Sequence, residues 1–133
     1  MKIWILAAVV AGFGACGAQA QDADIRETIT RQFEAFKVDD FATAFTYASP
    51  SLRMFFQTPE NFGRMVTQGY PMVWRPADVV YLELREEGGT YWQKVQITGA
   101  DGRVHYLEYR MEQAPEGWRI NGVQILDAPG ASV

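Results

Sequence analysis

The chain has 133 residues, 48% of them apolar and 14% aromatic, which is enough for one globular domain with a hydrophobic core. Its formal net charge is −4 at pH 7 and it has no run of basic residues, so the sequence argues against binding to nucleic acid or to anionic lipid surfaces. Cys16 is the only cysteine and His105 the only histidine, so the chain cannot form an internal disulfide, and a zinc site would need carboxylates for its other ligands. We therefore expect no metal and no other cofactor.

The first twenty residues have the pattern of an export signal. Lys2 precedes an apolar run over residues 3–10, and small residues then lead to Ala18-Gln19-Ala20, where cleavage is expected. Glycines follow the run, which is shorter than the roughly 20 apolar residues of a membrane-spanning helix. We expect residues 1–20 to be a cleaved signal peptide. Cleavage would leave no membrane span and would place the protein in the periplasm or outside the cell.

A second interpretation of this segment stays open. Phe13-Gly14-Ala15-Cys16 is similar to a lipoprotein cleavage box, in which Cys16 would be lipidated and become the new N-terminus. Phe13 stands where such boxes usually have leucine, so soluble export is favoured and a lipoprotein anchored through Cys16 is the alternative. The remaining chain is expected to form a single domain over residues 21–127, followed by a flexible tail over residues 128–133.

Helical spacing governs the first half of this domain. One apolar stripe recurs every three or four positions and consists of Ile25, Ile29, Phe33 and Phe36. It predicts a helix of about 14 residues that begins near a capping Asp24. Asp39-Asp40 starts a second short helix, and Ser49-Pro50 ends it because the residue before a proline disfavours helical backbone. Thr58-Pro59-Glu60 starts a third helix, which ends near Gly69.

After Tyr70-Pro71 the spacing changes to period two. Four alternating runs follow, over residues 73–86, 90–98, 103–113 and 117–126. Short turns that contain glycine separate them, so neighbouring runs should pair antiparallel. With three helices packed on one face of this curved four-stranded sheet, the expected fold class is α+β.

Alternation along the runs predicts which residues face the helices. The core-facing set is Val80, Leu82, Leu84, Val95, Ile97, His105, Leu107, Tyr109, Met111, Trp118 and Ile120. The outer face should carry Tyr81 and a mixture of charges, namely Glu83, Arg85, Lys94, Glu108, Arg110 and Arg119. Because both signs alternate across neighbouring runs, these charges are expected to pair with one another rather than to bind an anion.

Two resemblances follow from this arrangement. Helices before a late sheet, in a domain of this size, resemble the cone-shaped, cystatin-like fold of nuclear transport factor two and its SnoaL-like relatives. The motifs over residues 58–62, 69–76, 81–85 and 117–123 resemble an exported family known as domain of unknown function 4864, over about residues 22–126. This second resemblance implies the fold and the export of the chain, and it implies no activity.

No group of residues indicates catalysis. His105 lies on the apolar face of the predicted sheet, and no Gly-x-Ser-x-Gly sequence accompanies it, so a structural role is favoured. SnoaL-like enzymes resemble one another in using a pocket Asp or an Asp–His pair as general base, which makes Asp39 and Asp40 candidates. An aspartate before an apolar helical stripe is usually a cap, however, and we assign no catalytic residue.

The aromatic residues give the remaining functional signal. The candidate ligand-binding pocket consists of Tyr47, Phe55, Tyr70, Trp74, His105 and Tyr109, although the same side chains would also suit a core. We therefore expect an exported, non-enzymatic domain that binds a small hydrophobic ligand or a protein partner. The alternative is a SnoaL-like isomerase, dehydratase or hydrolase that uses a pocket Asp or His as general base. A homodimer through the outer face of the sheet, anchored by Tyr81, Trp92 and Tyr106, is a further expectation.

Overall fold

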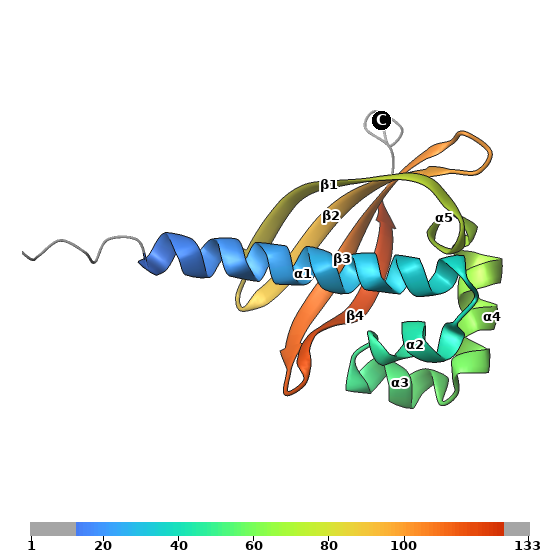
Figure 1. Ribbon diagram of the computed structural model, residues 1–133, viewed down its shortest axis with the longest axis horizontal. Helices are drawn as coiled ribbons and strands as arrows, with labels where there is room; N and C mark the ends of the chain where they lie inside the picture. Colours follow the sequence, from blue (N-terminus) through green and yellow to red (C-terminus); the bar gives the residue numbers. More distant parts are fainter. Residues whose placement is uncertain (1–12, 127–133) are drawn as a thin grey trace, which may run out of the picture.

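The computed structural model describes residues 13–126 and confirms the α+β class (Figure 1). The helices are α1 (Phe13–Lys37), α2 (Phe41–Thr46), α3 (Pro50–Phe56), α4 (Pro59–Gly69) and α5 (Pro71–Trp74). The strands are β1 (Pro76–Glu87), β2 (Thr90–Gly99), β3 (Val104–Ala114) and β4 (Gly117–Leu126). In Figure 1, α1 crosses the sheet, while α2 to α5 gather beside one end of it. The helices therefore form one layer and the sheet the other.

The sheet is an antiparallel meander in the order β1-β2-β3-β4, as the turn spacing predicts. The β1–β2 connection has only two residues, Gly88 and Gly89, with φ of 58° and 86°. Both values are positive, which a two-residue hairpin turn of this kind requires and which glycine adopts without a steric penalty. The likeness to the fold of nuclear transport factor two stays a prediction.

α1 begins earlier than predicted. The helix is already formed at Asp24, whose backbone carbonyl accepts a hydrogen bond from the Thr28 hydroxyl at 3.1 Å, so Asp24 is not its cap. Alanines at positions 18, 20 and 23 favour helix and allow it to extend toward the N-terminus. The predicted cleavage point after Ala20 lies within α1, whereas the apolar run over residues 3–10 and the predicted tail over residues 128–133 lie outside the described residues. No helix in the described part is long and apolar enough to cross a membrane.

Two helices, α3 and α5, add to the three that the spacing predicts. Ser49-Pro50 does follow α2, but it also starts α3, because Ser49 Oγ accepts a hydrogen bond from the Leu52 amide at 3.2 Å and Pro50 occupies the first helical position. α3 has no buried residue, although its apolar residues Leu52, Phe55 and Phe56 recur at helical spacing. α5 is a single turn that begins at Pro71.

The core lies between α1 and the inner face of the sheet. The apolar stripe of α1 is buried as predicted, and it packs with Val95 and Ile97 of β2, with Leu107, Tyr109 and Met111 of β3, and with Trp118 and Ile120 of β4. The core-facing positions predicted for these residues of β2, β3 and β4 are therefore confirmed. On the outer face, Arg85 makes a two-point hydrogen bond with Glu108 at 3.0 and 3.1 Å, and the Trp92 ring lies between Arg85 and Arg110.

β1 does not follow the predicted alternation. Tyr81 pairs with Val95 and Leu84 pairs with Gln93, so β1 contains one extra residue between these pairs and forms a bulge. Tyr81 consequently faces α1, where its hydroxyl is 2.7 Å from Thr30 Oγ1, and Leu84 packs on the core. The expectation that Leu82 and the 40%-exposed Val80 face the core is wrong. So is the outward assignment of Tyr81, which removes it as a dimer anchor.

The link between α2 and α3 attaches the helical layer to the free edge of β4. The Ser49 amide donates to the Ile120 carbonyl at 2.8 Å, and the Ile120 amide donates to the Tyr47 carbonyl at 2.9 Å. These bonds form a one-residue parallel bridge between Ala48 and Ile120. Because of this bridge, α3 starts directly beside β4.

Candidate functional site

A cleft of about 380 Å³ lies between α3, α4 and β4, with α1 at its inner side. Fourteen residues line it, and none is an aspartate, glutamate, lysine, arginine or histidine. Among those from the helices are Phe36, Leu52, Phe55, Phe56, Phe62 and Val66. Those from β4 are Ile120, Gly122 and Val123. A concave, mostly apolar lining of this size is typical of sites for small molecules.

Four phenylalanine rings lead from the mouth of the cleft into the core. The ring centroids are 5.0 Å apart for Phe55 and Phe56, 5.6 Å for Phe56 and Phe62, and 6.0 Å for Phe62 and Phe36. The exposed fraction falls along the series from 75% at Phe55 to 5% at Phe62 and 0% at Phe36. An apolar molecule that enters the cleft therefore meets aromatic surface at every depth.

A second bulge shapes the wall that β4 provides. Met111 pairs with Ile120 and Arg110 pairs with Gly122, so Asn121 is the extra residue. This bulge explains how Ile120 and Val123, which are three positions apart, both face the cleft. Asn121 Oδ1 also accepts a hydrogen bond from Ser49 Oγ at 2.7 Å, which joins the start of α3 to the strand.

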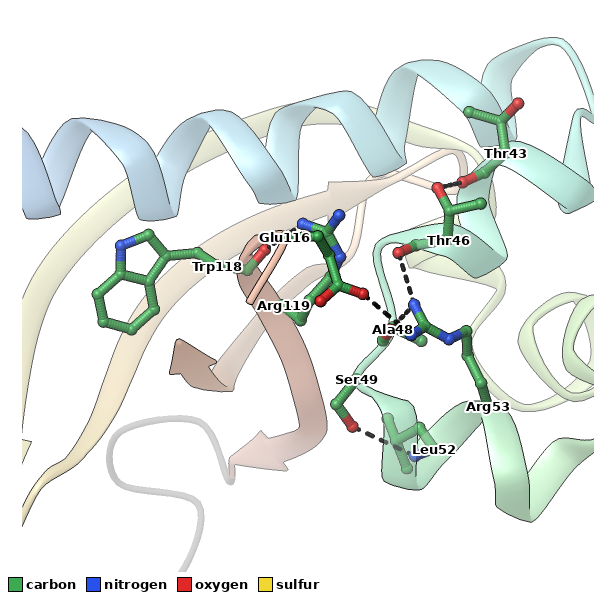
Figure 2. A network of polar contacts seen from close by, with 9 residues as sticks. All are labelled: Thr43, Thr46, Ala48, Ser49, Leu52, Arg53, Glu116, Trp118 and Arg119. Carbon is green, nitrogen blue, oxygen red and sulfur yellow. Dashed lines mark hydrogen bonds and ion pairs between the residues drawn. The ribbon is translucent and has the colours of Figure 1, made fainter. Parts of the chain in front are cut away.

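Arg53 holds α3 in place as the outer wall (Figure 2). Its Nη1 donates to the carbonyl oxygens of Thr46 and Ala48 at 3.0 and 2.9 Å, and its Nη2 lies 3.2 Å from Glu116 Oε2. Hydrogen bonds from the Glu116 backbone amide and from Arg53 hold the pKa of the Glu116 carboxyl below its ordinary value. The β3–β4 turn and α3 are thus joined by an ion pair outside the cleft.

Two polar side chains reach the cleft. Gln32 of α1 is 5% exposed, and its Nε2 donates to the Ala44 carbonyl at 3.1 Å. The Tyr70 hydroxyl donates to the Val123 carbonyl at 3.4 Å, a long hydrogen bond. The cleft therefore combines apolar walls with a small number of hydrogen-bonding groups.

The six residues predicted to line one pocket lie in different parts of the structure. Phe55 and Tyr70 are in the cleft. Tyr47 lies under the guanidinium of Arg119, 5.6 Å from ring centroid to Cζ, and Trp74 is covered in the same way by Arg75 at 4.2 Å. Each of these two rings is covered by an arginine of the protein itself, and neither ring lines the cleft.

His105 and Tyr109 belong to the sheet. His105 is partly buried opposite Ile97. Tyr109 is fully buried, packs edge-on against Phe33 at 6.3 Å, and has no hydrogen-bond partner for its hydroxyl among the described residues. Burial raises the pKa of Tyr109 far above its ordinary value, so its hydroxyl stays protonated. The structure thus uses Tyr109 as a core residue.

The two candidate carboxylates have structural partners. Asp40 caps α2, where it accepts hydrogen bonds from the Thr43 amide and hydroxyl at 3.1 and 2.7 Å. Asp39 accepts hydrogen bonds from Trp74 Nε1 at 2.8 Å and from Arg75 Nη2 at 3.0 Å. These bonds hold the pKa of each carboxyl below its ordinary value. A lowered pKa weakens a carboxylate as a general base near neutral pH.

Sequence reasoning missed Gln32, Leu52 and Phe56 as lining residues. A signal for Gln32 exists, because this polar residue falls inside the apolar stripe of α1, between Ile29 and Phe36. Leu52 and Phe56 also carry a signal, because together with Phe55 they recur at i, i+3 and i+4, the spacing of one helix face. Within residues 13–126, no three His, Cys, Asp or Glu side chains lie close enough to hold a metal ion.

Comparison with known families agrees with the motif resemblance. The chain matches the Domain of unknown function (DUF4864) family over residues 18–133, which includes α1 from Ala18 onward and every later element of the described fold. It belongs to the DUF4864 family. No curated protein and no solved structure matches it. DUF4864 has no assigned activity, so the function of this member must be inferred from its own cleft.

Proposed function

We propose that the protein is a non-enzymatic binding domain that holds a small apolar molecule in the cleft between α3, α4 and β4. The observation that carries this proposal is the cleft itself, about 380 Å³ in volume and without charged side chains in its lining. This volume falls within the range of about 300–1,000 Å³ found for small-molecule sites.

The mouth of the cleft supports the same function. Phe55 of α3 lines the cleft and is 75% exposed, although it is a large apolar residue. Exposed apolar side chains beside a concave apolar surface are typical of a binding site. A ligand that covers this surface would gain about 25 cal/mol for each Å² removed from water.

The carboxylates favour binding over catalysis. Asp39 accepts hydrogen bonds from Trp74 and Arg75, and Asp40 caps α2. Neither carboxylate lines the cleft. His105, the only histidine, is also outside its lining. A molecule in the cleft would therefore meet no general base from this set.

Two tryptophan substitutions on one helix test the proposal. Leu52→Trp places a large ring in the cleft, whereas Met54→Trp places the same ring on the exposed side of α3. We expect the wild type and Met54→Trp to bind the neutral fluorescent probe N-phenyl-1-naphthylamine alike. Leu52→Trp should weaken binding at least about tenfold, because it fills the space that the probe needs. Equal binding by both variants, or no binding by the wild type, would contradict the proposal.

A further inference from the structure

The sharpest chemical feature of the cleft is a buried carboxamide in an apolar wall. Gln32 is 5% exposed, and its neighbours on the α1 stripe, Ile29 and Phe36, are fully buried. A polar group in such surroundings is costly unless its hydrogen bonds are satisfied. The bonds of Gln32 therefore need to be accounted for atom by atom.

One end of this carboxamide is fixed by α2. Its Nε2 lies 3.1 Å from the carbonyl oxygen of Ala44, which is itself fully buried. A carbonyl oxygen only accepts hydrogen bonds, so the nitrogen of Gln32 must face Ala44. This contact determines the orientation of the amide group and directs Oε1 away from Ala44.

The other end has no partner within residues 13–126. Among the described residues, no group donates a hydrogen bond to Gln32 Oε1. Oε1 of Gln32 is not completely sealed from solvent, whereas Oε1 of the second buried glutamine, Gln93, is sealed inside the protein. Gln32 lines the cleft, and Oε1 is its one atom with an unused hydrogen-bonding capacity on the acceptor side, so we take it as the acceptor for a molecule bound there.

The rest of the lining excludes a charged partner. None of the fourteen residues carries a positive or negative side chain, so a carboxylate or an amine inside the cleft would be buried without a counter-charge. Arg53, the cation of α3, is already bound to Thr46, Ala48 and Glu116. A neutral molecule fits these surroundings better than an ion of the same length.

We propose that the natural ligand is an uncharged, mainly apolar molecule with a hydroxyl group, and that this hydroxyl donates a hydrogen bond to Oε1 of Gln32. The inference rests on the proposed function of the cleft, and it makes Gln32 the residue that determines specificity. A free aliphatic alcohol has this chemistry.

Two isomeric probes isolate the hydrogen bond. 1-Octanol and heptyl methyl ether have the same atoms, but only the alcohol can donate to Gln32 Oε1. The measured quantity is the ratio of their dissociation constants, obtained by displacement of N-phenyl-1-naphthylamine, in the wild type and in Gln32→Leu. We expect the preference for the alcohol to fall about fivefold in the variant, as for the loss of one hydrogen bond.

The ratio separates a specific role from structural damage. Gln32→Leu also loses the bond to Ala44, but any resulting loosening of α1 would weaken both isomers alike. Thr28→Val is the matched control, because Thr28 is a buried polar residue of the same helix that does not line the cleft. We expect it to leave the ratio unchanged.

Octanoate tests the requirement for a neutral ligand. At pH 7 the wild type should bind octanoate at least about tenfold more weakly than 1-octanol, because the cleft offers the carboxylate no counter-charge. An unchanged isomer ratio in Gln32→Leu, or octanoate binding as tight as that of the alcohol, would overturn the assignment of ligand class while leaving the cleft as a binding site. If none of the probes binds the wild type, the proposed function itself fails.

Discussion

Gln57 connects α3 to α4 and so joins two walls of the cleft. Its φ is 73° and its ψ is −42°, and the Thr58 amide donates to the Phe56 carbonyl at 2.8 Å across it. These values describe a γ-turn with positive φ, which is strained for any residue with a Cβ. Gln57 is one of two non-glycine residues with positive φ in the described part of the chain, the other being Asp39.

Replacing Gln57 should reveal this strain. We expect Gln57→Gly to leave the free energy of unfolding unchanged or to raise it by up to about 1 kcal/mol. The reason is that relief of the steric penalty at positive φ offsets the greater freedom that glycine gives to the unfolded chain. Gln57→Val should lower it by more than about 1 kcal/mol, since a β-branched residue tolerates positive φ poorly. Urea unfolding monitored by tryptophan fluorescence measures both changes.

Glu34→Gly is the control for glycine itself. Glu34 is exposed in the middle of α1, where the same change should cost about 1 kcal/mol. If Gln57→Gly and Glu34→Gly destabilise the protein equally, the turn at Gln57 is not strained.

At the scale of elements, strands with an uninterrupted period were predictable and those with bulges were not. β3 alternates strictly from His105 to Met111, so its core residues follow from the sequence. The extra residue of β1 can be recognised only from its register against β2, where Gln93 Nε2 donates into the bulge to the Leu82 carbonyl at 3.0 Å. That hydrogen bond joins residues eleven positions apart, and no local pattern contains it.

The cleft was only partly predictable for a related reason. Phe55 and Tyr70 were recognisable as aromatic residues near the end of the helical layer. Their cleft, however, depends on α3, a helix without buried residues that is held by Arg53 and by the hydrogen bond between Ser49 and Asn121. These tertiary contacts leave no periodic trace in the sequence.

Two leucine substitutions test the revised faces of the sheet. Leu107→Ala removes a fully buried side chain of β3 and should cost about 2–5 kcal/mol of stability. Leu82→Ala should cost less than about 1.5 kcal/mol, because Leu82 lies in the bulge and outside the core. If both variants lose the same free energy of unfolding in urea, Leu82 faces the core, as the simple alternation of β1 predicts.

For the whole molecule, export and the position of α1 can be tested together. From residue 20 onward, the first buried residue of α1 is Ile25, and in Figure 1 the start of the helix extends beyond the sheet. A chain that begins at Gln21 would therefore keep the core contacts that α1 makes from Ile25 onward. We expect its free energy of unfolding to equal that of the full chain within about 0.5 kcal/mol.

N-terminal sequencing of the natural protein provides the matching measurement. Cleavage after Ala20 predicts that the mature chain begins at Gln21 and is soluble. A lipidated Cys16 at the N-terminus would favour the lipoprotein alternative, and an intact Met1 would contradict export.

The bulges also affect how copies of the chain meet at high concentration. A flat sheet edge with free backbone groups is a template on which further strands can add, and proteins usually interrupt or cover such edges. In this sheet, the bridge from Ala48 covers part of the β4 edge, and register shifts after Pro76 and Tyr81 break up the β1 edge. The same irregularity that turns Tyr81 toward α1 therefore leaves β1 a poor template for aggregation.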